Sequence, residues 1–292
     1  MTVRTYTDRC PGVLRPWIAD DGALVRLRLI GGRLQRRSLR ALIDVTTEHA
    51  DGTIHLTKRS NLQLRGIAHS DGCVAEALVD AVAAAGLLPS PAHELVRNIM
   101  VSPLTGRLGG RVDLRPLADE LDTGLCSDPA FARLAGRFLF VLDDGRGDVA
   151  ERSLDLGLVA LDSSSVQLRI GTRHWGPTVA LADAPRALLD LTRRFLVARG
   201  DGETALWHVD ELPAPAAALV GTAHERDART LVTSDSPPFG ILAQDDGRAV
   251  EHVRVPDGVL TPQLAEALLG RATHEIVVTP WRSVLLPDLE TG

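Results

Sequence analysis

Hydrophobic and polar positions in the first part of the chain follow the periods of a small β-α-β-β module. Between Ala23 and Ile30 apolar residues alternate with Arg26 and Arg28, as in a half-buried strand. Ser38 is a helix-capping residue type, and apolar residues recur at helical spacing after it. The pattern predicts a strand over 23–30, a glycine turn at 31–32, a helix over 38–49, strands over 53–57 and 62–67, and an Ala-rich helix over 73–85.

The middle of the chain changes character several times. A polar, proline-marked passage covers 89–115, and 201–237 has little periodicity and several prolines, as in a linker. The acidic, glycine-containing segment 143–148 is expected to be a hairpin turn, because it lacks the spacing of a calcium loop. The pattern also predicts a helix over 128–135, strands over 138–142, 156–161 and 166–170, and an amphipathic helix over 185–198.

The last segment repeats the landmarks of the first. Asp20-Asp21-Gly22 recurs as Asp245-Asp246-Gly247, and Gly32 before the first helix matches Gly258 before another. Thr57-Lys58-Arg59-Ser60 corresponds, with one residue inserted, to Thr279-Pro280-Trp281-Arg282-Ser283, which makes Arg282 the partner of Arg59. Separations of 222 to 226 residues indicate an internal duplication around a middle domain.

These patterns predict an α/β chain (α+β in detail) with a pseudo-twofold repeat. The expected parts are a first half-module over 1–88, a central mixed-sheet domain over 89–200, a linker over 201–237 and a second half-module over 238–292. No apolar run reaches the roughly 18 residues of a membrane span, and the N-terminus lacks the apolar stretch of a secretory signal. We therefore expect a cytoplasmic protein with no membrane partner.

Charge is unevenly distributed in this acidic protein. The formal net charge of −6 argues against a nucleic-acid partner, yet 1–65 holds 11 Arg and Lys58 against 6 Asp and Glu. Guanidinium groups pair with carboxylates through two hydrogen bonds at once, so this excess is consistent with an anion site. A genome of high GC content, which encodes Arg in place of Lys throughout, explains the same excess. Lys58 is the only lysine of the chain.

The cysteines do not form a recognisable ligand set. Cys10, Cys73 and Cys126 are 63 and 53 positions apart, without the close spacing of zinc or iron–sulfur ligands. Buried structural thiols are the simpler interpretation, and no metal ligand is assigned. No Gly-x-Gly-x-x-Gly follows a strand, so nothing indicates a bound dinucleotide.

Several motifs resemble the precorrin-3B synthases of the nitrite/sulfite reductase superfamily, which are built from ferredoxin-like half-modules around an α/β domain. Arg9-Cys10-Pro11-Gly12 is similar to the start of a precorrin-3B synthase. Thr57-Lys58-Arg59-Ser60-Asn61-Leu62-Gln63 resembles the Thr-x-Arg-x-Asn-x-Gln signature of the family, and Arg97-Asn98-Ile99-Met100 its second arginine motif. Thr279-Pro280-Trp281-Arg282 near the end is also similar.

The resemblance implies that arginines bind the carboxylates of a tetrapyrrole. Arg59 and Arg97 match anion-binding residues of the family, and Arg137 matches a lysine of the reductases, whereas Leu139 replaces a second lysine. That replacement argues against sulfite reduction. The list of implied tetrapyrrole-binding residues is Arg59, Asn61, Gln63, Arg97, Arg137 and Arg282.

As an activity, the resemblance implies oxygen-dependent hydroxylation of precorrin-3A in aerobic cobalamin synthesis, with an electron-donor protein as partner. It also implies a [4Fe-4S] cluster with iron or sirohaem, but the four-cysteine set that family members carry after the second half-module is not found in this chain. The chain is thus either a fragment or a shortened relative. A sulfite or nitrite reductase and a non-catalytic tetrapyrrole-binding module are the alternatives.

Overall fold

A computed structural model describes residues 8–290, so the chain ends 1–7 and 291–292, which belong to the two predicted half-modules, lie outside it. The described chain divides into two compact units. One, the repeat unit, consists of 10–94 and 236–290, and the other, the central unit, of 95–235 with residues 8 and 9. Within the described residues no helix is long and apolar enough to cross a membrane.

The repeat unit contains the same order of elements twice. The first copy comprises β1 (Trp17–Ala19), β2 (Gly22–Leu27), β3 (Arg33–Gln35), α1 (Arg36–His49), β4 (Ile54–Leu56) and β5 (Leu62–Ile67). It continues with β6 (His69–Ser70), β7 (Cys73–Val74) and α2 (Glu76–Ala84). The second copy comprises β13 (Gly240–Ala243), β14 (Ala249–Val253), β15 (Val259–Leu260), α6 (Pro262–Arg271), β16 (Glu275–Val278) and β17 (Val284–Leu289).

The two copies exchange one strand each. The first sheet has the order β1-β2-β5-β4-β15 and the second β13-β14-β17-β16-β3, so each five-stranded sheet takes its last strand from the other copy. In β3, Leu34 pairs with Ile276 of β16, and in β15, Leu260 pairs with Ile54 of β4. The sheets therefore depend on segments more than 200 positions apart in the sequence.

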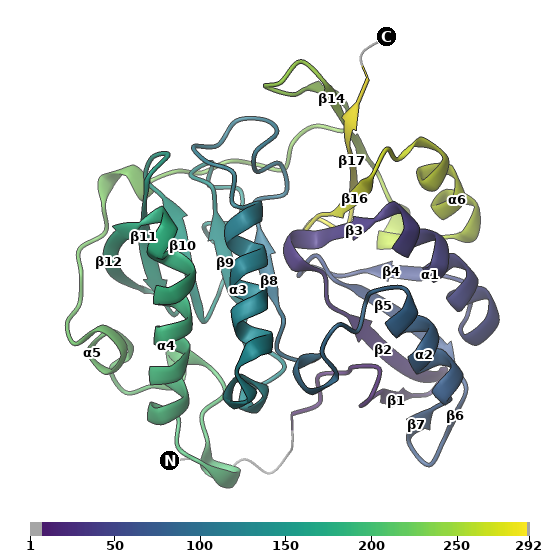
Figure 1. Cartoon of the computed structure of the whole chain (residues 1–292), viewed down its shortest axis with the longest axis horizontal. Helices are drawn as coiled ribbons and strands as arrows, with labels where there is room; N and C mark the ends of the chain where they lie inside the picture. The colour runs from purple at the N-terminus through teal and green to yellow at the C-terminus, as the bar shows by residue number, and fades with distance from the viewer. Residues whose placement is uncertain (1–7, 291–292) are drawn as a thin grey trace. The chain divides into compact units, whose positions relative to one another are not determined.

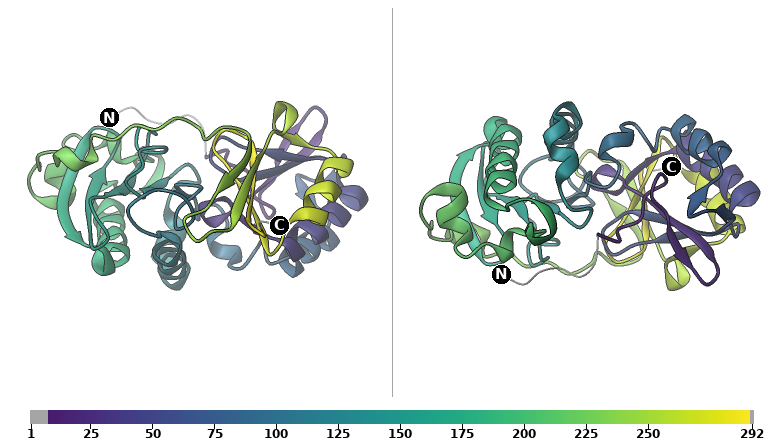
Figure 2. Two further views of the ribbon diagram at one scale, coloured as in Figure 1. Left: turned by 90° about the horizontal axis from the view of Figure 1, so that it is seen from above. Right: turned by 90° about the horizontal axis from the view of Figure 1, so that it is seen from below.

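One apolar core joins the copies. It contains Leu34, Leu42 and Ile54 of the first copy together with Leu268 and Val284 of the second, all almost fully buried. Figures 1 and 2 show α1, α2 and α6 on the same side of the two sheets, and α1 packs against both other helices. The predicted duplication is confirmed as a pseudo-twofold repeat with a shared interior.

Two predicted helix starts in the repeat unit are wrong. Helix α1 begins at Arg36 rather than at Ser38, which is buried inside the helix. The backbone N–H of Arg36 donates to the carbonyl of His274 in the other copy, so this end needs no side-chain cap. Helix α2 begins at Glu76, because Cys73–Val74 form a short strand instead.

The central unit is built on one mixed five-stranded sheet. Its elements are β8 (Ile99–Val101), α3 (Arg115–Ser127), β9 (Phe140–Asp143), β10 (Leu156–Ala160), β11 (Ser165–Ile170), β12 (His174–Ala180), α4 (Ala184–Ala198) and α5 (Pro215–Val220). The sheet order is β12-β11-β10-β9-β8. Strands β8, β9 and β10 are parallel, β11 is antiparallel to β10, and β12 is antiparallel to β11. The predicted α+β fold with a mixed central sheet is confirmed.

The two faces of this sheet are covered differently. Helices α3 and α4 lie together on one face (Figures 1 and 2), where Phe138 packs against Phe140 and Phe195. On the other face Leu139 and Val141 pack with Met100, Val149 and Leu154 in a small apolar cluster. Successive residues of a strand point to opposite faces, so Asp143 at the end of β9 is on the same face as Leu139 and Val141.

Several sequence predictions for the central unit need correction. The helix expected over 128–135 is a 3-10 turn, Pro129–Arg133, because Asp128 ends α3 and its side chain accepts from the N–H of Ala130. The polar passage 89–115 contains the buried strand β8, and β12 was not predicted. The segment 201–237 contains α5, and its Val209, Leu212 and Leu219 are buried.

Candidate functional site

Two turns with the same backbone geometry carry most of the candidate residues in the repeat unit. In the first, between β4 and β5, the N–H of Thr57 donates to Asn61 O (2.9 Å) and the N–H of Ser60 to Thr57 O (3.1 Å). In the second, between β16 and β17, Thr279 N donates to Ser283 O (2.9 Å) and Arg282 N to Thr279 O (3.1 Å). We call 57–60 and 279–282 the twin turns.

The geometry corrects the predicted pairing of residues between the copies. Ser60 and Arg282 both have positive φ, 57° and 59°, so they occupy the same place in the two turns. The threonine hydroxyls also match: Thr57 Oγ1 accepts from Asn61 N at 3.1 Å and Thr279 Oγ1 from Ser283 N at 3.2 Å. No residue is inserted, and the counterpart of Arg59 is Trp281 rather than Arg282.

Glycines bring the twin turns together. Gly32, with φ of 75°, lies so close that a Cβ on it would be 3.1 Å from Ser60 Cβ and would collide with the carbonyl of Val278, directly before the second turn. Gly258 lies against the second turn alone, since its Cβ would lie 2.9 Å from Arg282 Cβ. Both turns therefore lie against these glycines, where the copies exchange strands.

The twin turns give this end of the repeat unit a positive charge. Lys58 and Arg282 are exposed and Arg59 is half-buried. Side chains of this kind bind carboxylates with one or two charge-assisted hydrogen bonds each. The structure thus places Arg59 and Arg282 in adjoining turns, although they are not equivalent residues.

Two other candidate residues of the signature have different roles in the fold. Asn61 is buried, and its Oδ1 accepts from the N–H of Leu29 at 2.9 Å, which fixes the end of β2 to the first turn. Gln63 is half-buried on β5, opposite Arg26 and His55 of the neighbouring strands. Asn61 positions the turn, whereas Gln63 remains a candidate for ligand contact.

Arg97 and Arg137 belong to the central unit. Arg97 is buried, and its guanidinium donates to both carboxylate oxygens of Asp122 on α3, at 2.7 and 2.8 Å. That pair satisfies the fork of the guanidinium locally. Arg137 is exposed before β9, and Leu139 is buried in the small apolar cluster.

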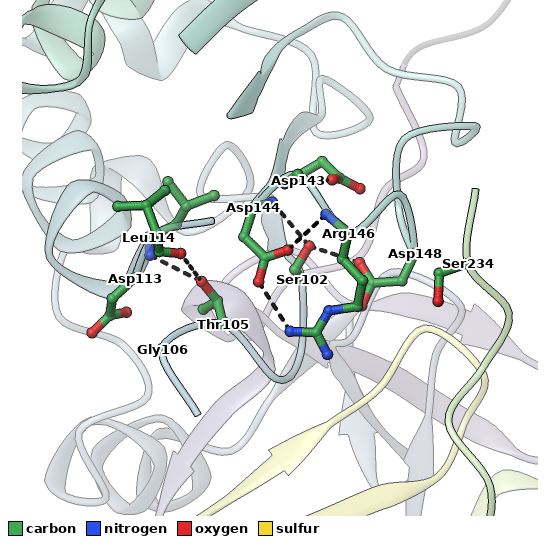
Figure 3. A network of polar contacts seen from close by, with 12 residues as sticks. Ser102, Thr105, Gly106, Asp113, Leu114, Asp143, Asp144, Arg146, Asp148 and Ser234 are labelled. Atoms are coloured by element: carbon green, nitrogen blue, oxygen red, sulfur yellow. Dashed lines mark hydrogen bonds and ion pairs between the residues drawn. The ribbon is translucent and has the colours of Figure 1, made fainter. Parts of the chain in front are cut away.

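The segment 143–148 is a connection between parallel strands rather than the predicted hairpin. Figure 3 shows its polar contacts, and we call it the acidic loop. Asp143 accepts from the N–H groups of Gly145 (2.9 Å), Gly147 (2.9 Å) and Val149 (3.1 Å). A hairpin was expected from composition alone, but β9 and β10 run in the same direction, so the loop must cross the face of the sheet.

Burial raises the pKa values of the two other carboxyls of the acidic loop. It raises the pKa of Asp144 to about 6, although the Arg146 guanidinium opposes the shift. Burial and the nearby charge of Asp143 raise the pKa of Asp148 to about 7. Asp148 also accepts from the hydroxyl of Ser102 at 2.7 Å, so it is held in place whether or not it is protonated.

An open pocket of about 330 Å³ adjoins this loop. It is lined by Gly147, Asp148, Glu151, Arg152 and the segment Thr233–Asp235. A carboxyl that titrates near neutral pH beside a pocket can exchange a proton with solvent or with a bound molecule. The described residues contain no group of three or more His, Cys, Asp or Glu placed to hold a metal ion.

The cysteines do not fit the iron–sulfur cluster that the resemblance implies. Cys10 is buried before β1, Cys73 is exposed on β7, and Cys126 is on α3 of the central unit. The expectation of buried thiols is therefore wrong for Cys73. A cubane cluster needs thiolates that converge on one point. We therefore assign no redox step to the described residues.

Sequence reasoning missed the residues around the second turn. His252 of β14 is buried, and its Nε2 lies 2.6 Å from Ser283 Oγ, which lies 2.6 Å from Thr279 Oγ1. The sequence contained a signal for this cluster. Aligning Thr57 with Thr279 without an insertion pairs Arg59 with Trp281 and Asn61 with Ser283.

Comparisons with known proteins agree with this architecture. Residues 19–82 match the family model described as Nitrite/Sulfite reductase ferredoxin-like half domain. The chain is similar to a Sinorhizobium protein named Precorrin-3B synthase, with 34% identity over 140 residues, 47% of this chain and 28% of that protein. It is similar to Sulfite reductase (ferredoxin) 1 of Mycolicibacterium paratuberculosis, with 27% identity over 167 residues, 54% of this chain and 29% of that protein.

The fold is also that of a solved structure. The Mycobacterium tuberculosis NirA protein superposes with a TM-score of 0.73 over 97% of this chain and 59% of its own, at 18% sequence identity. Similarity at that level shows the fold alone. The matched segments span less than a third of the curated relatives.

Proposed function

We propose, from the nitrite/sulfite reductase ferredoxin-like half domain at 19–82 and from the twin turns, that this chain binds a polycarboxylate tetrapyrrole as part of a precorrin-3B synthase-like oxidoreductase. The observation that carries the proposal is that Lys58, Arg59 and Arg282 belong to adjoining turns, which both lie near Gly32. A tetrapyrrole with acetate and propionate side chains needs several cations from separate elements, and the two turns supply them.

The residues of this chain account for binding and orientation. A guanidinium that donates two hydrogen bonds to one carboxylate fixes both the position and the plane of that group. Asn61 and Gly32 hold the first turn in place, so its basic side chains need little reordering when a ligand binds. Oxidation of the substrate is proposed as the activity of the precorrin-3B synthase-like oxidoreductase as a whole, and no oxidation step is assigned to the described residues.

A second candidate is a tetrapyrrole-binding module without catalysis. The cysteines favour it, because the three described ones, Cys10, Cys73 and Cys126, are too few for a four-cysteine ligand set and are divided between the two units. Turnover separates the two. Anaerobically purified protein, given iron, sulfide, an electron donor, precorrin-3A and oxygen, forms the hydroxylated lactone under the enzyme hypothesis and only binds precorrin-3A under the other.

The binding itself is tested with uroporphyrin, a stable carboxylate-rich tetrapyrrole, by absorption titration. Arg59→Gln removes one charge-assisted contact and is expected to weaken binding about tenfold, with a smaller dependence on salt than the wild type shows. The matched control is Arg37→Gln, an exposed arginine on α1. Wild-type protein that does not bind, or equal affinities of the two variants, would contradict the proposal.

A further inference from the structure

The twin turns have the same backbone but opposite chemistry. Arg59 of the first turn is replaced in the second by Trp281, and Lys58 by Pro280. The strand beside each turn changes in the same sense. Arg26 of β2 lies opposite Gln63, and at the matching register His252 of β14 lies opposite Leu285. The second turn thus carries an indole ring where the first carries a guanidinium, and its own cation, Arg282, takes the place of Ser60.

The second turn is held by a directional chain of hydrogen bonds. His252 Nδ1 lies 2.9 Å from the carbonyl of Pro237, which can only accept, so Nδ1 carries the proton. His252 Nε2 must then accept from Ser283 Oγ at 2.6 Å, and Ser283 accepts from Thr279 Oγ1 at 2.6 Å. All three side chains are buried, so the turn that carries Trp281 is fixed before any ligand arrives.

An aromatic cluster surrounds this chain of hydrogen bonds. The ring of His252 lies 4.4 Å from that of Phe239 and 6.4 Å from that of Trp281, measured between centroids. The guanidinium of Arg254 lies 4.2 Å above the Phe239 ring. Burial lowers the pKa of His252, so the imidazole is a neutral member of the cluster.

The cluster is open to solvent on one side. Phe239 is 46% exposed and Trp281 is half-buried, in a chain with only 3% aromatic residues. Exposed aromatic rings next to a cationic turn are suited to a ligand that is flat and apolar in one part and anionic in another. Gly32, which lies against Ser60 of the first turn and against Val278 before the second, keeps these two parts side by side.

We propose that Trp281 is a substrate-binding residue that stacks on the conjugated face of the tetrapyrrole, while Lys58 and Arg59 of the other copy bind its carboxylates. This inference rests on the proposed function and adds to it that the duplicated site is polar in one half and aromatic in the other. It assigns the ligand a single orientation at a pseudo-symmetric site. Trp281 replaces a charge contact by a stacking contact at the same backbone position.

The test compares two porphyrins that share a ring but differ in carboxylates, the carboxylate-rich uroporphyrin and the carboxylate-poorer coproporphyrin. Trp281→Ala is expected to weaken both by roughly tenfold at low and high salt alike, since stacking depends on the ring. Arg59→Gln is expected to weaken uroporphyrin more than coproporphyrin, and less at high salt. Trp281→Phe keeps a ring and is expected to restore most of the affinity.

Two controls separate stacking from damage to the fold. Trp17→Ala removes another partly exposed tryptophan of the same unit and is expected to leave both affinities unchanged. Thermal unfolding of each variant shows whether the unit is intact. Wild-type affinity for both porphyrins in Trp281→Ala, with binding impaired in Arg59→Gln, would overturn this inference and leave the proposed function standing. Wild-type protein that binds neither porphyrin would overturn both.

Discussion

Two carboxyl groups of the acidic loop are placed where ionisation is unfavourable. Asp144 and Asp148 are buried beside Asp143. The guanidinium of Arg146 forms an ion pair with each of them. Their pKa values are raised to about 6 and about 7, chiefly because burial removes the charged form from water. A raised pKa of an acid means that the folded protein holds a proton that the unfolded chain releases.

The stability of the protein is therefore expected to fall as pH rises from about 4 to about 7. For Asp148 the folded pKa of about 7 lies above the ordinary 3.8, so its contribution is lost within that window. Asp148→Asn keeps the shape but cannot ionise. Between pH 5 and pH 8 the wild type should lose roughly 2–3 kcal/mol more unfolding free energy than the variant, measured by urea denaturation.

The matched control for this prediction is Asp227→Asn. The hydrogen bond from Arg229 lowers the pKa of Asp227 to about 2, so this carboxylate does not titrate between pH 5 and pH 8. Its removal should leave the slope of stability against pH as in the wild type. The same slope in Asp148→Asn would contradict the assignment of a buried, titrating carboxyl.

At the scale of the element, the turns next to the helices depend on glycine in different degrees: Gly32 precedes α1 and Gly86 follows α2. Gly32 and Gly86 both have positive φ, 75° and 77°. A Cβ on Gly86 would have no neighbour within 4 Å, whereas one on Gly32 would meet Ser60 and collide with the carbonyl of Val278. Gly86 is therefore needed for its backbone angle alone, and Gly32 for its backbone angle and for space.

Gly86→Ala is expected to cost about 1 kcal/mol, from the backbone angle alone. Gly32→Ala adds a displacement of the twin turns and is expected to cost roughly 3 kcal/mol. Uroporphyrin titration should show weaker binding in Gly32→Ala and wild-type binding in Gly86→Ala. Equal losses of stability, measured by chemical denaturation, would mean that the turns are not held through Gly32.

Elements with a clear period were predictable from the sequence, and their boundaries were less so. The amphipathic stripe of α4 and the alternation of β2 correspond to elements in the structure. Ser38 was a misleading cap, because the carbonyl of His274 in the other copy satisfies the start of α1. Strand β8 is only Ile99–Val101, too short for alternation to mark it within a polar passage.

For the candidate site residues, the sequence identified which residue types occur at the motifs better than it identified what each side chain does. Arg59 lies in a turn that can meet a ligand, but Asn61 and Arg97 of the same motifs are hydrogen-bonded inside the protein. A motif records that a residue type is needed and does not distinguish a ligand contact from a contact that positions the chain. The pairing of Arg59 with Trp281 needed the backbone hydrogen bonds, since the assumed insertion placed Arg282 there instead.

At the scale of the whole molecule, the repeat was readable but the strand exchange was not. Separations of 222 to 226 residues reveal two copies. The exchanged strands β3 and β15 are three and two residues long, too short for a periodic signal of their own. Their partners are chosen by packing in the shared core, and therefore the halves are structurally incomplete without each other.

The exchange predicts that the two copies of the repeat unit unfold together. Leu34 is 1% exposed on β3, so it belongs to the first copy in sequence and to the second sheet in space. Leu34→Ala should cost about 2–5 kcal/mol. Hydrogen exchange should show equal losses of protection in β4 and β5 and in β16 and β17, because opening either sheet exposes the shared core. Ile241→Ala, at a side chain 73% exposed on β13, should change neither. If protection fell in only one sheet, the copies would be independent domains. The twin turns would then have no common scaffold to hold a ligand between the cations of the first turn and Trp281 of the second.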